Sequence, residues 1–449
     1  MHRNASARSG SISWLAATGG LLAALGLTDC LLATRETECG SDRACPSNFS
    51  CNLQTSICEP SPSAENDGGA GRDGGADMTG CRGEADCASG LACVDGQCQA
   101  CRGHSDCESQ VCEPGSNLHQ QRGCLPADSV VYTRAGGDCA TADGTLARPF
   151  CTIRGALGLV NGSKVSVRIL PGVGGQNAYS EQLNFDGSTT VLAANLYGST
   201  VVGQAASLSG ASSVVLISGS ARLLLDGLIL EGGTTPLLCS VGTSSIATDI
   251  RLRRVTIRGA TGVGLSSSNC TVSVDRSRFE SNAGGALFFR NNTTYQVTNS
   301  FIINNSVDMF SYAAVFISGG SGKFAFNTLV GNLRSGSKPG AIDCASTAAT
   351  ISNSIIYGPI AGAATQIALG CQLDNSLIAA NDPFSGGTSV LRGTPKFVDV
   401  ANRDIHLNSD DSDCVDKIST NAGLGVAEDF DGTPRLKGGG YDVGAHELR

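Results

Sequence analysis

The chain has 449 residues, more than one simple core organises, so we expect two or more domains. It contains 59 glycines but only 16% charged residues, which is typical of short strands joined by many turns rather than of a helical enzyme. The formal net charge of −9 argues against nonspecific nucleic-acid binding, and we expect no nucleic-acid partner.

Residues 1-29 predict a signal peptide. A short basic stretch precedes the uncharged apolar run Ile12–Leu27, which is too short to span a membrane comfortably. The residues that follow, Leu-Thr-Asp-Cys, resemble a bacterial lipobox, although Asp29 stands where that pattern has Gly, Ala or Ser. The resemblance implies a lipid on Cys30 and an exported lipoprotein held at the outer membrane or cell surface. Secretion into the medium is the alternative.

Twelve of the 20 cysteines lie between residues 39 and 124 in three groups of four. The groups at 81-98 and 101-124 both begin Cys-Arg-Gly and reach the next cysteine at the same spacing, so they are repeats. Units this small have no room for a core, and disulfides, which persist outside the cytosol, replace it. Four cysteines allow three pairings, and the sequence does not choose among them. Zinc is the alternative, but gaps of four or five residues and scarce histidine favour disulfides, so we expect no metal.

These groups divide the N-terminal part of the chain. Residues 30-58 form a tether and a first Cys-rich module, and residues 81-124 form two more modules. The stretch 59-80, rich in Pro, Ser, Gly and Asp, is a flexible linker. The modules resemble small Cys-rich units with Dickkopf-like spacing.

After Val130, short apolar runs recur with a period of 22 to 28 residues. Such a period is typical of stacked single-coil units, each with about three short strands. We therefore predict an all-β fold: a right-handed parallel β-helix preceded by small disulfide-rich modules. Four of the seven aligned anchor positions are Asn, for which we expect left-handed corners and an amide ladder along the axis. The anchors are Asp226, Arg254, Arg276, Asn299, Asn327, Asn353 and Asn375.

Both ends of this region resemble known families. The stretch "VVYTRAGGDCATADGTLARPFCTIRGAL" from Val130 resembles the start of pectate-lyase-like β-helix proteins. The resemblance implies an N-terminal cap over 130-164 whose short helix plugs the first coil, with Cys139 and Cys151 stapling the cap loop. Coils would then follow over 165-395.

The last stretch, "DFDGTPRLKGGGYDVGAHELR", is similar to the bacterial choice-of-anchor Q domain, and it implies a surface protein with C-terminal coils over 396-449. Members often carry a sorting tail after this motif, so Cys30 is the expected anchor here. The matching residues are Asp429, Gly432, Pro434, Arg435, Asp442, Gly444, Ala445 and Glu447.

Stacking also predicts disulfides between coils. Cys344 and Cys371 occupy nearly the same place on adjacent coils, and Cys239 and Cys270 lie about one coil apart. Cys414 is left over.

Candidate chemistry is sparse. No histidine lies between Val130 and Val400, which counts against a polygalacturonase-like enzyme but leaves a lyase based on Arg or Lys open. Seven arginines lie between residues 251 and 290. The coil alignment pairs three of them with acids on neighbouring coils: Arg253 with Asp275, Arg258 with Glu280, and Arg254 with Asp226. It leaves four unpaired as a candidate binding patch for acidic polysaccharide: Arg251, Arg276, Arg278 and Arg290.

Two functional hypotheses follow. The first is a non-enzymatic surface protein that holds a β-helix away from the membrane and binds acidic polysaccharide, cell-surface glycans or neighbouring surface molecules. The second is a polysaccharide lyase or another carbohydrate-active enzyme on a pectate-lyase-like fold. The sequence assigns no catalytic residue, and we expect no cofactor.

Overall fold

The computed structural model describes residues 49-52, 57-60 and 81-448, the last range with gaps at 102-103, 114-122, 162, 187-191, 198-206, 211, 243-247, 307-311, 334-338, 346-348, 359-364 and 420-423. The expected signal peptide and Cys30 lie outside these residues. The chain divides into two compact units, Met1–Asp77 and Met78–Arg449. In the described residues, no helix combines the length and apolar character needed to cross a membrane.

In the first unit the structure describes a single hairpin of β1 (Phe49–Asn52) and β2 (Ile57–Pro60), whose strand register places Cys51 opposite Cys58.

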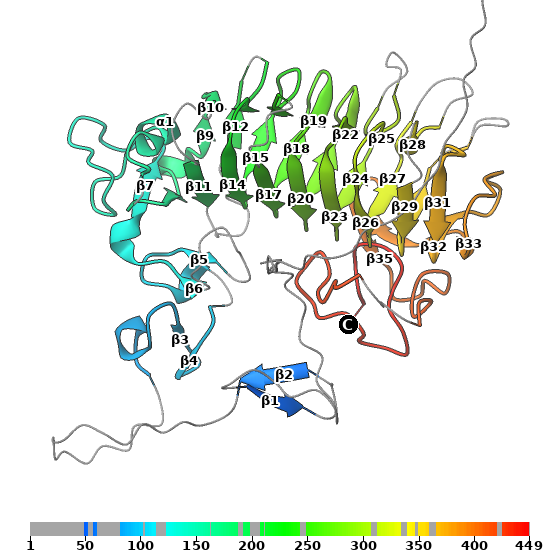
Figure 1. Cartoon of the computed structure of the whole chain (residues 1–449), viewed down its shortest axis with the longest axis horizontal. Helices are drawn as coiled ribbons and strands as arrows, with labels where there is room; N and C mark the ends of the chain where they lie inside the picture. Colours follow the sequence, from blue (N-terminus) through cyan, green and yellow to red (C-terminus); the bar gives the residue numbers. More distant parts are fainter. Residues whose placement is uncertain are drawn as a thin grey trace, which may run out of the picture. The chain divides into compact units, whose positions relative to one another are not determined.

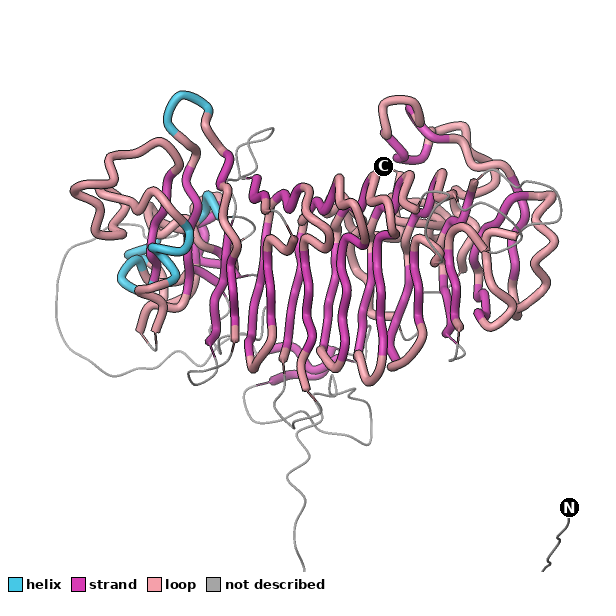
Figure 2. The backbone as a smooth tube through the Cα atoms, turned by 90° about the horizontal axis from the view of Figure 1, so that it is seen from above, coloured by secondary structure: helices cyan, strands magenta, loops and turns pink. Residues whose placement is uncertain are grey.

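The second unit contains a right-handed parallel β-helix, as the period predicted (Figure 1). Seen from above, its strands succeed one another like rungs (Figure 2). The first sheet comprises β7 (Val130–Arg134), β8 (Ser166–Leu170), β11 (Leu192–Tyr197), β14 (Ala221–Asp226), β17 (Asp249–Arg253), β20 (Thr271–Asp275), β23 (Thr294–Thr298), β26 (Ser321–Ala325), β29 (Ala349–Ser352) and β31 (Cys371–Asp374). The second comprises β9 (Ala178–Tyr179), β12 (Ser207–Ser209), β15 (Ile229–Glu231), β18 (Thr256–Arg258), β21 (Arg278–Glu280), β24 (Phe301–Ile303), β27 (Thr328–Val330), β30 (Ile355–Tyr357), β32 (Ser376–Ala379) and β33 (Val390–Gly393). The third comprises β10 (Leu183–Phe185), β13 (Val215–Ile217), β16 (Leu237–Ser240), β19 (Val263–Ser268), β22 (Gly285–Arg290), β25 (Val315–Ile317) and β28 (Ile342–Cys344).

The core follows from the alternation of side chains along each strand. Ile250 and Leu252 of β17 are fully buried, whereas Asp249, Arg251 and Arg253 point outward. Equivalent apolar residues of successive coils stack in register, as Ile250 does on Val272 of β20. Each large aliphatic side chain buried in this way stabilises the fold by about 1.5 to 3 kcal/mol.

The corner between the first and second sheets carries a left-handed residue in each of several coils. Arg254, Arg276, Asn299, Asn353 and Asn375 all have φ between 45° and 54°, as the anchor alignment predicted. Two anchors differ, because the left-handed residues there are Gly227 and Phe326, one place after Asp226 and one before Asn327. An arginine or phenylalanine costs more in this conformation than Asn does.

The expected amide ladder does not run along the anchors. The residue one place after the left-handed corner bonds along the axis instead. The Oγ of Ser277 accepts from the N–H of Val255, and Asn327, the anchor that follows the left-handed Phe326, accepts the N–H of Ser300 through Oδ1. A second ladder of buried amides lies at another turn, where Asn282 Nδ2 donates to Asn305 Oδ1 at 2.8 Å and Asn305 Nδ2 to Asn332 Oδ1 at 3.2 Å. These side chains satisfy turn backbone that is buried and has no strand partner.

Helix α1 (Ile153–Leu157) closes the first coil. Thr152 caps it by accepting the N–H of Gly155, and Ile153 is fully buried against the core. Glu181 accepts the N–H groups of Ile153 and Arg154, so it holds the cap on the following coil. Helix α1 therefore acts as a plug that shields the apolar interior of the first coil.

The two described Cys-rich modules share one disulfide order, first with third cysteine and second with fourth. Their hairpins are β3 (Ala92–Val94) with β4 (Gln97–Gln99), and β5 (Cys112–Glu113) with β6 (Gly123–Cys124). These bonds use all eight sulfur atoms, so none of these cysteines offers zinc a thiolate. The bonds are Cys81–Cys93, Cys87–Cys98, Cys101–Cys112 and Cys107–Cys124.

Within the β-helix, the structure joins the same three cysteine pairs that stacking and the cap resemblance predict: Cys139–Cys151, Cys239–Cys270 and Cys344–Cys371. Cys414 is buried with a free thiol, and burial raises the pKa of that thiol.

The expectation of further coils over 396-449 is wrong. Residues after Gly393 form a lateral lobe, here called the clasp, with one antiparallel hairpin of β34 (Phe397–Asp399) and β35 (Asp404–Leu407). Carboxylates such as Asp399 and Asp411 bond the backbone N–H groups of its turns, so the segment folds without a ladder to the last coil. In Figure 1 the clasp lies beside the coils rather than at their end.

Candidate functional site

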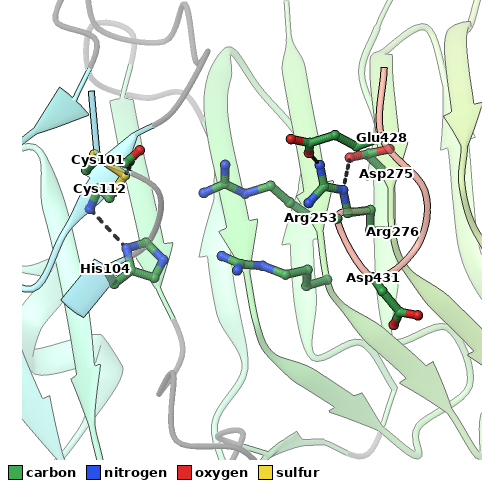
Figure 3. Close-up of a pocket in the computed structure, with 10 residues that line it drawn as sticks. Cys101, His104, Cys112, Arg253, Asp275, Arg276, Glu428 and Asp431 are labelled. Carbon is green, nitrogen blue, oxygen red and sulfur yellow. Dashed lines mark hydrogen bonds and ion pairs between the residues drawn. A yellow bond between two sulfur atoms is a disulfide. The ribbon is translucent and has the colours of Figure 1, made fainter. Parts of the chain in front are cut away.

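A cavity of about 680 Å³ lies where three parts of the second unit meet. The third Cys-rich module (101-124) forms one wall, the β-helix corner forms the floor, and the clasp forms the opposite wall (Figure 3). In Figure 3 Arg253 points from the β-helix toward the module, and Glu428 and Asp431 approach from the clasp. The described lining residues are Cys101, His104, Cys112, Arg253, Arg254, Asp275, Arg276, Glu428, Asp431 and Gly432.

Two arginines of the floor are held by a fully buried carboxylate. Asp226 ends β14, its Oδ2 accepts Arg253 Nε at 2.9 Å, and its Oδ1 accepts Arg254 Nε at 2.9 Å. Burial alone would raise the pKa of the Asp226 carboxyl, but Arg253, the His104 hydrogen bond and Arg254 together hold it well below its usual range. Asp226 therefore stays ionised and orients both guanidinium groups at the cavity edge.

His104 docks the module on the same carboxylate. Its Nδ1 accepts the N–H of Cys112 at 3.0 Å, and its Nε2 lies 3.2 Å from Asp226 Oδ2. Burial lowers the pKa of His104, so the ring is neutral at pH 7 and its proton sits on Nε2, facing Asp226. Both nitrogens of this imidazole are thus engaged in structure.

The third arginine joins the floor to the clasp. Arg276 forms ion pairs with Asp275, at 3.4 Å, and with Glu428 of the clasp. Burial lowers the pKa of Arg276. The left-handed backbone of Arg254 and Arg276, at corners where other coils place Asn, turns both side chains toward the cavity.

The clasp binds the same row of corners farther along the axis. Arg435 is almost fully buried, donates to Asn299 Oδ1 at 2.7 Å, and has its guanidinium carbon 4.1 Å from the ring centroid of Phe326. The Gly444 N–H donates to the Asn353 carbonyl at 2.8 Å. A side chain at Gly444, where φ is +95°, would collide with Thr328 and Ile355.

The C-terminal motif is a set of structural contacts. Asp429 is fully buried and accepts backbone N–H groups from Asp431, Thr433 and Glu447. Glu447 pairs with Arg435 at 3.4 Å and also accepts N–H groups of the same lobe. Asp429, Arg435, Gly444 and Glu447 therefore shape the clasp and its contact with the coils.

One group near the cavity has the arrangement of a metal site, formed by Asp429, Asp431 and His446. Its ligand atoms already accept hydrogen bonds: Asp429 accepts three backbone N–H groups, and His446 Nδ1 accepts the N–H of Leu407 at 3.1 Å. Neutral His446 then carries its proton on Nε2, the nitrogen nearest Asp431. The group does not fit a resident cation.

The expected strand register is found, and one of the three expected ion pairs, Arg254 with Asp226, forms; the other two differ. Arg253 lies beside Asp275 and Arg258 beside Glu280, yet these arginines bond Asp226 and Glu231 of the preceding coil. Glu280 is taken by Arg278 of its own strand. Residues two apart on a strand lie on the same face, so Arg278 reaches Glu280 directly. The coil alignment considered only residues on different coils and therefore did not include this pair.

The four arginines expected to be unpaired all have partners, and for two of them, Arg251 and Arg278, the partner lies two residues away on the same strand. Arg251 pairs with Asp249 at 3.0 Å and Arg278 with Glu280 at 2.8 Å, while Arg290 donates to Ser266 Oγ at 3.0 Å. The fourth, Arg276, is the member of the predicted patch that lines the cavity.

The sequence analysis missed His104 and the pair Arg253 and Arg254 as cavity residues. One signal was available for His104, since the second module has Glu84 at the matching place in its Cys-Arg-Gly repeat. The convergence of module, corner and clasp depends on contacts between segments more than 100 residues apart, such as His104 with Asp226.

Comparisons with known proteins add little. No family model matches the chain, and no curated protein matches it. Among solved structures, the chain is similar to the pectin methylesterase from Aspergillus niger, at 15% identity and a TM-score of 0.29, over 60% of this chain and 84% of the other.

Proposed function

We propose that this chain is an exported, lipid-anchored bacterial surface protein that binds an acidic polysaccharide or a related surface glycan in the cavity and does not transform it. The observation that carries the proposal is the convergence of Arg253, Arg254 and Arg276 on one cavity, two of them from strained left-handed corners. Strain of this kind often accompanies function.

The chemistry of the lining suits such a ligand. Guanidinium groups bind carboxylates through paired N–H donors, and uronic acids and other acidic sugars carry such groups. Glu428 and Asp431 on the opposite wall can accept from sugar hydroxyls. Because Asp226, Asp275 and Glu428 balance the three arginines, we expect a ligand that carries one carboxylate and several hydroxyls on each sugar, as a polyuronate does, rather than a more densely charged sulfate or phosphate polymer.

Export and anchoring rest on the N-terminal sequence and on cysteine usage. The lipobox-like stretch ending at Cys30 supports a lipid anchor, and disulfides in both modules and coils fit an oxidising compartment. The likeness of the last 21 residues to the choice-of-anchor Q domain supports a surface location. The modules and linker would then act as a spacer between membrane and β-helix.

The state of the described side chains supports a non-catalytic role. A lyase needs a base near the substrate. In the described lining, His104 is the sole imidazole, both its nitrogens are engaged, and no lysine is present. Of the lining carboxylates, Asp275 and Glu428 are paired with Arg276, and Asp431 lies 3.4 Å from His406 Nε2. The arginines remain charged and act as donors rather than bases.

A paired measurement on the purified mature chain tests the proposal against the enzyme alternative. Polygalacturonate and alginate are titrated at low and high salt, and the absorbance of the unsaturated lyase product is followed in the same samples. We expect saturable binding that weakens with salt, and flat absorbance. Rising absorbance would establish the lyase instead. Absence of binding to these and to a panel of bacterial surface glycans would remove the glycan role.

A further inference from the structure

An outward-facing row of side chains runs along the third sheet of the β-helix. Strand pairing places one residue from each of six coils in register, and neighbouring members stand about 4.8 Å apart, one strand spacing. The flanking residues of each strand, such as Leu287 and Phe289 of β22, are fully buried, so the row between them lies on the outer side of the sheet. Two members of the row, Phe288 and Ser266, are covered by their neighbours, at 4% and 5% exposure, and the other four are partly exposed. The row consists of Leu216, Leu238, Ser266, Phe288, Phe316 and Asp343.

Three aromatic rings gather in the middle of this row. The rings of Phe288 and Phe316 have centroids 5.3 Å apart, and the ring of Tyr312 lies 4.7 Å from each. Tyr312 is 40% exposed and Phe316 is half-buried, so the cluster presents aromatic surface to solvent. The β-helix core does not require these rings, because the inward positions of the same strands already fill it.

Polar groups flank the rings. The exposed Arg290 has its guanidinium carbon 5.9 Å from the Phe288 centroid and donates to Ser266 Oγ in the row. Asp343 follows Phe316 directly and is partly exposed. The surface therefore combines aromatic faces with hydrogen-bonding side chains of both signs.

We propose that this row is a second carbohydrate site, which binds an extended oligosaccharide along the helix axis mainly through its C–H faces. A sugar ring presents a C–H face that packs on aromatic rings and an equatorial edge of hydroxyls that bonds groups such as Arg290 and Asp343. A protein partner fits less well, because charged residues are depleted at the centre of protein interfaces and here Arg290 and Asp343 lie directly beside the central rings. The proposal is independent of the cavity.

Binding of neutral hexasaccharides derived from cellulose, mannan and xylan tests this site by calorimetry. The wild-type chain should bind at least one of them with an affinity that changes little between low salt and about 1 M salt, where charges are screened within about 3 Å. Tyr312→Ala with Phe316→Ala should weaken that binding at least about tenfold, because two stacking faces are lost. The cavity variant Arg254→Gln with Arg276→Gln should bind the neutral hexasaccharide as wild type does.

Two outcomes would overturn the proposal: no neutral hexasaccharide binds, or the aromatic variant binds as tightly as wild type. Analytical sedimentation of the wild-type chain and the aromatic variant tests the alternative that the row mediates self-association. A wild-type dimer that becomes monomeric in the aromatic variant would make the row an interface between copies and contradict the carbohydrate site. Thermal unfolding of the variant checks that it remains folded.

Discussion

Replacing Asp226 by Asn should release the contact between the third Cys-rich module and the β-helix. The substitution keeps the shape of the side chain but removes its charge, and it offers an N–H₂ group to three donors. Asp226 is fully buried and bonds Arg253, Arg254 and His104. Breaking a buried ion pair typically costs about 3 to 5 kcal/mol. We expect the lower end, near 3 kcal/mol, because Arg254 is 43% exposed and can turn to water.

Asp249→Asn is the matched control. Asp249 lies one coil along, pairs with the single Arg251 at 3.0 Å, and remains partly exposed at 18%. A pair of this kind is worth about 0.2 to 1 kcal/mol. Chemical unfolding of both variants, with proteolysis of residues 101-124 as a second measure, gives the comparison. If the two variants lose the same free energy of unfolding and resist protease equally, Asp226 is not the docking residue described above.

Three further predictions can be checked separately. A non-reducing digest should contain the peptides linked by Cys139–Cys151, Cys239–Cys270 and Cys344–Cys371, and, because β1 and β2 place Cys51 opposite Cys58 as in the other hairpins, it should also contain Cys39–Cys51 and Cys45–Cys58. Cys30→Ser should move the mature protein from the membrane to the soluble fraction; persistence in the membrane would contradict the lipid anchor. The carboxylate of Asp431, 3.4 Å from Nε2, and the hydrogen bond to Asp404, against burial, raise the pKa of His406 above its usual value of about 6.5, so its contribution to stability is complete below that pH and is lost as pH rises through the folded-state pKa. His406→Gln should therefore lower the unfolding temperature at acidic pH and match wild type at about pH 9; equal curves at every pH would refute this.

The coil architecture could be predicted because a β-helix repeats the same local demands. A period in the twenties, a turn residue at each corner and inward aliphatic residues are all local, and strand pairing follows from them. The strand register places Arg253 beside Asp275 and Asp275 beside Thr298, at spacings of 22 and 23 residues, as the repeat implies. The cap was implied by the resemblance of the stretch from Val130 to the start of pectate-lyase-like β-helix proteins.

The site was less predictable because ion pairing depends on choices among several neighbours. An arginine such as Arg278 can reach acids on the coil before, the coil after or two residues away, and only side-chain geometry decides. The docking of the clasp was invisible for a related reason, since Arg435 meets Asn299 across 136 residues. The residues around Arg435 were singled out by a resemblance, but they shape a lateral lobe rather than more coils.

The most direct test of the proposed function is the affinity of the cavity for hexagalacturonate in matched arginine variants. Arg254→Gln with Arg276→Gln removes two guanidinium groups that line the cavity. Arg251→Gln removes one from β17 that does not line the cavity and pairs with Asp249. With charged hydrogen bonds worth about 1.5 to 3 kcal/mol each, the double variant should bind at least about a hundredfold more weakly by calorimetry at low salt. Arg251→Gln should bind as wild type does. Equal affinities for wild type and the double variant would contradict a ligand in this cavity, and so would an equal loss in Arg251→Gln.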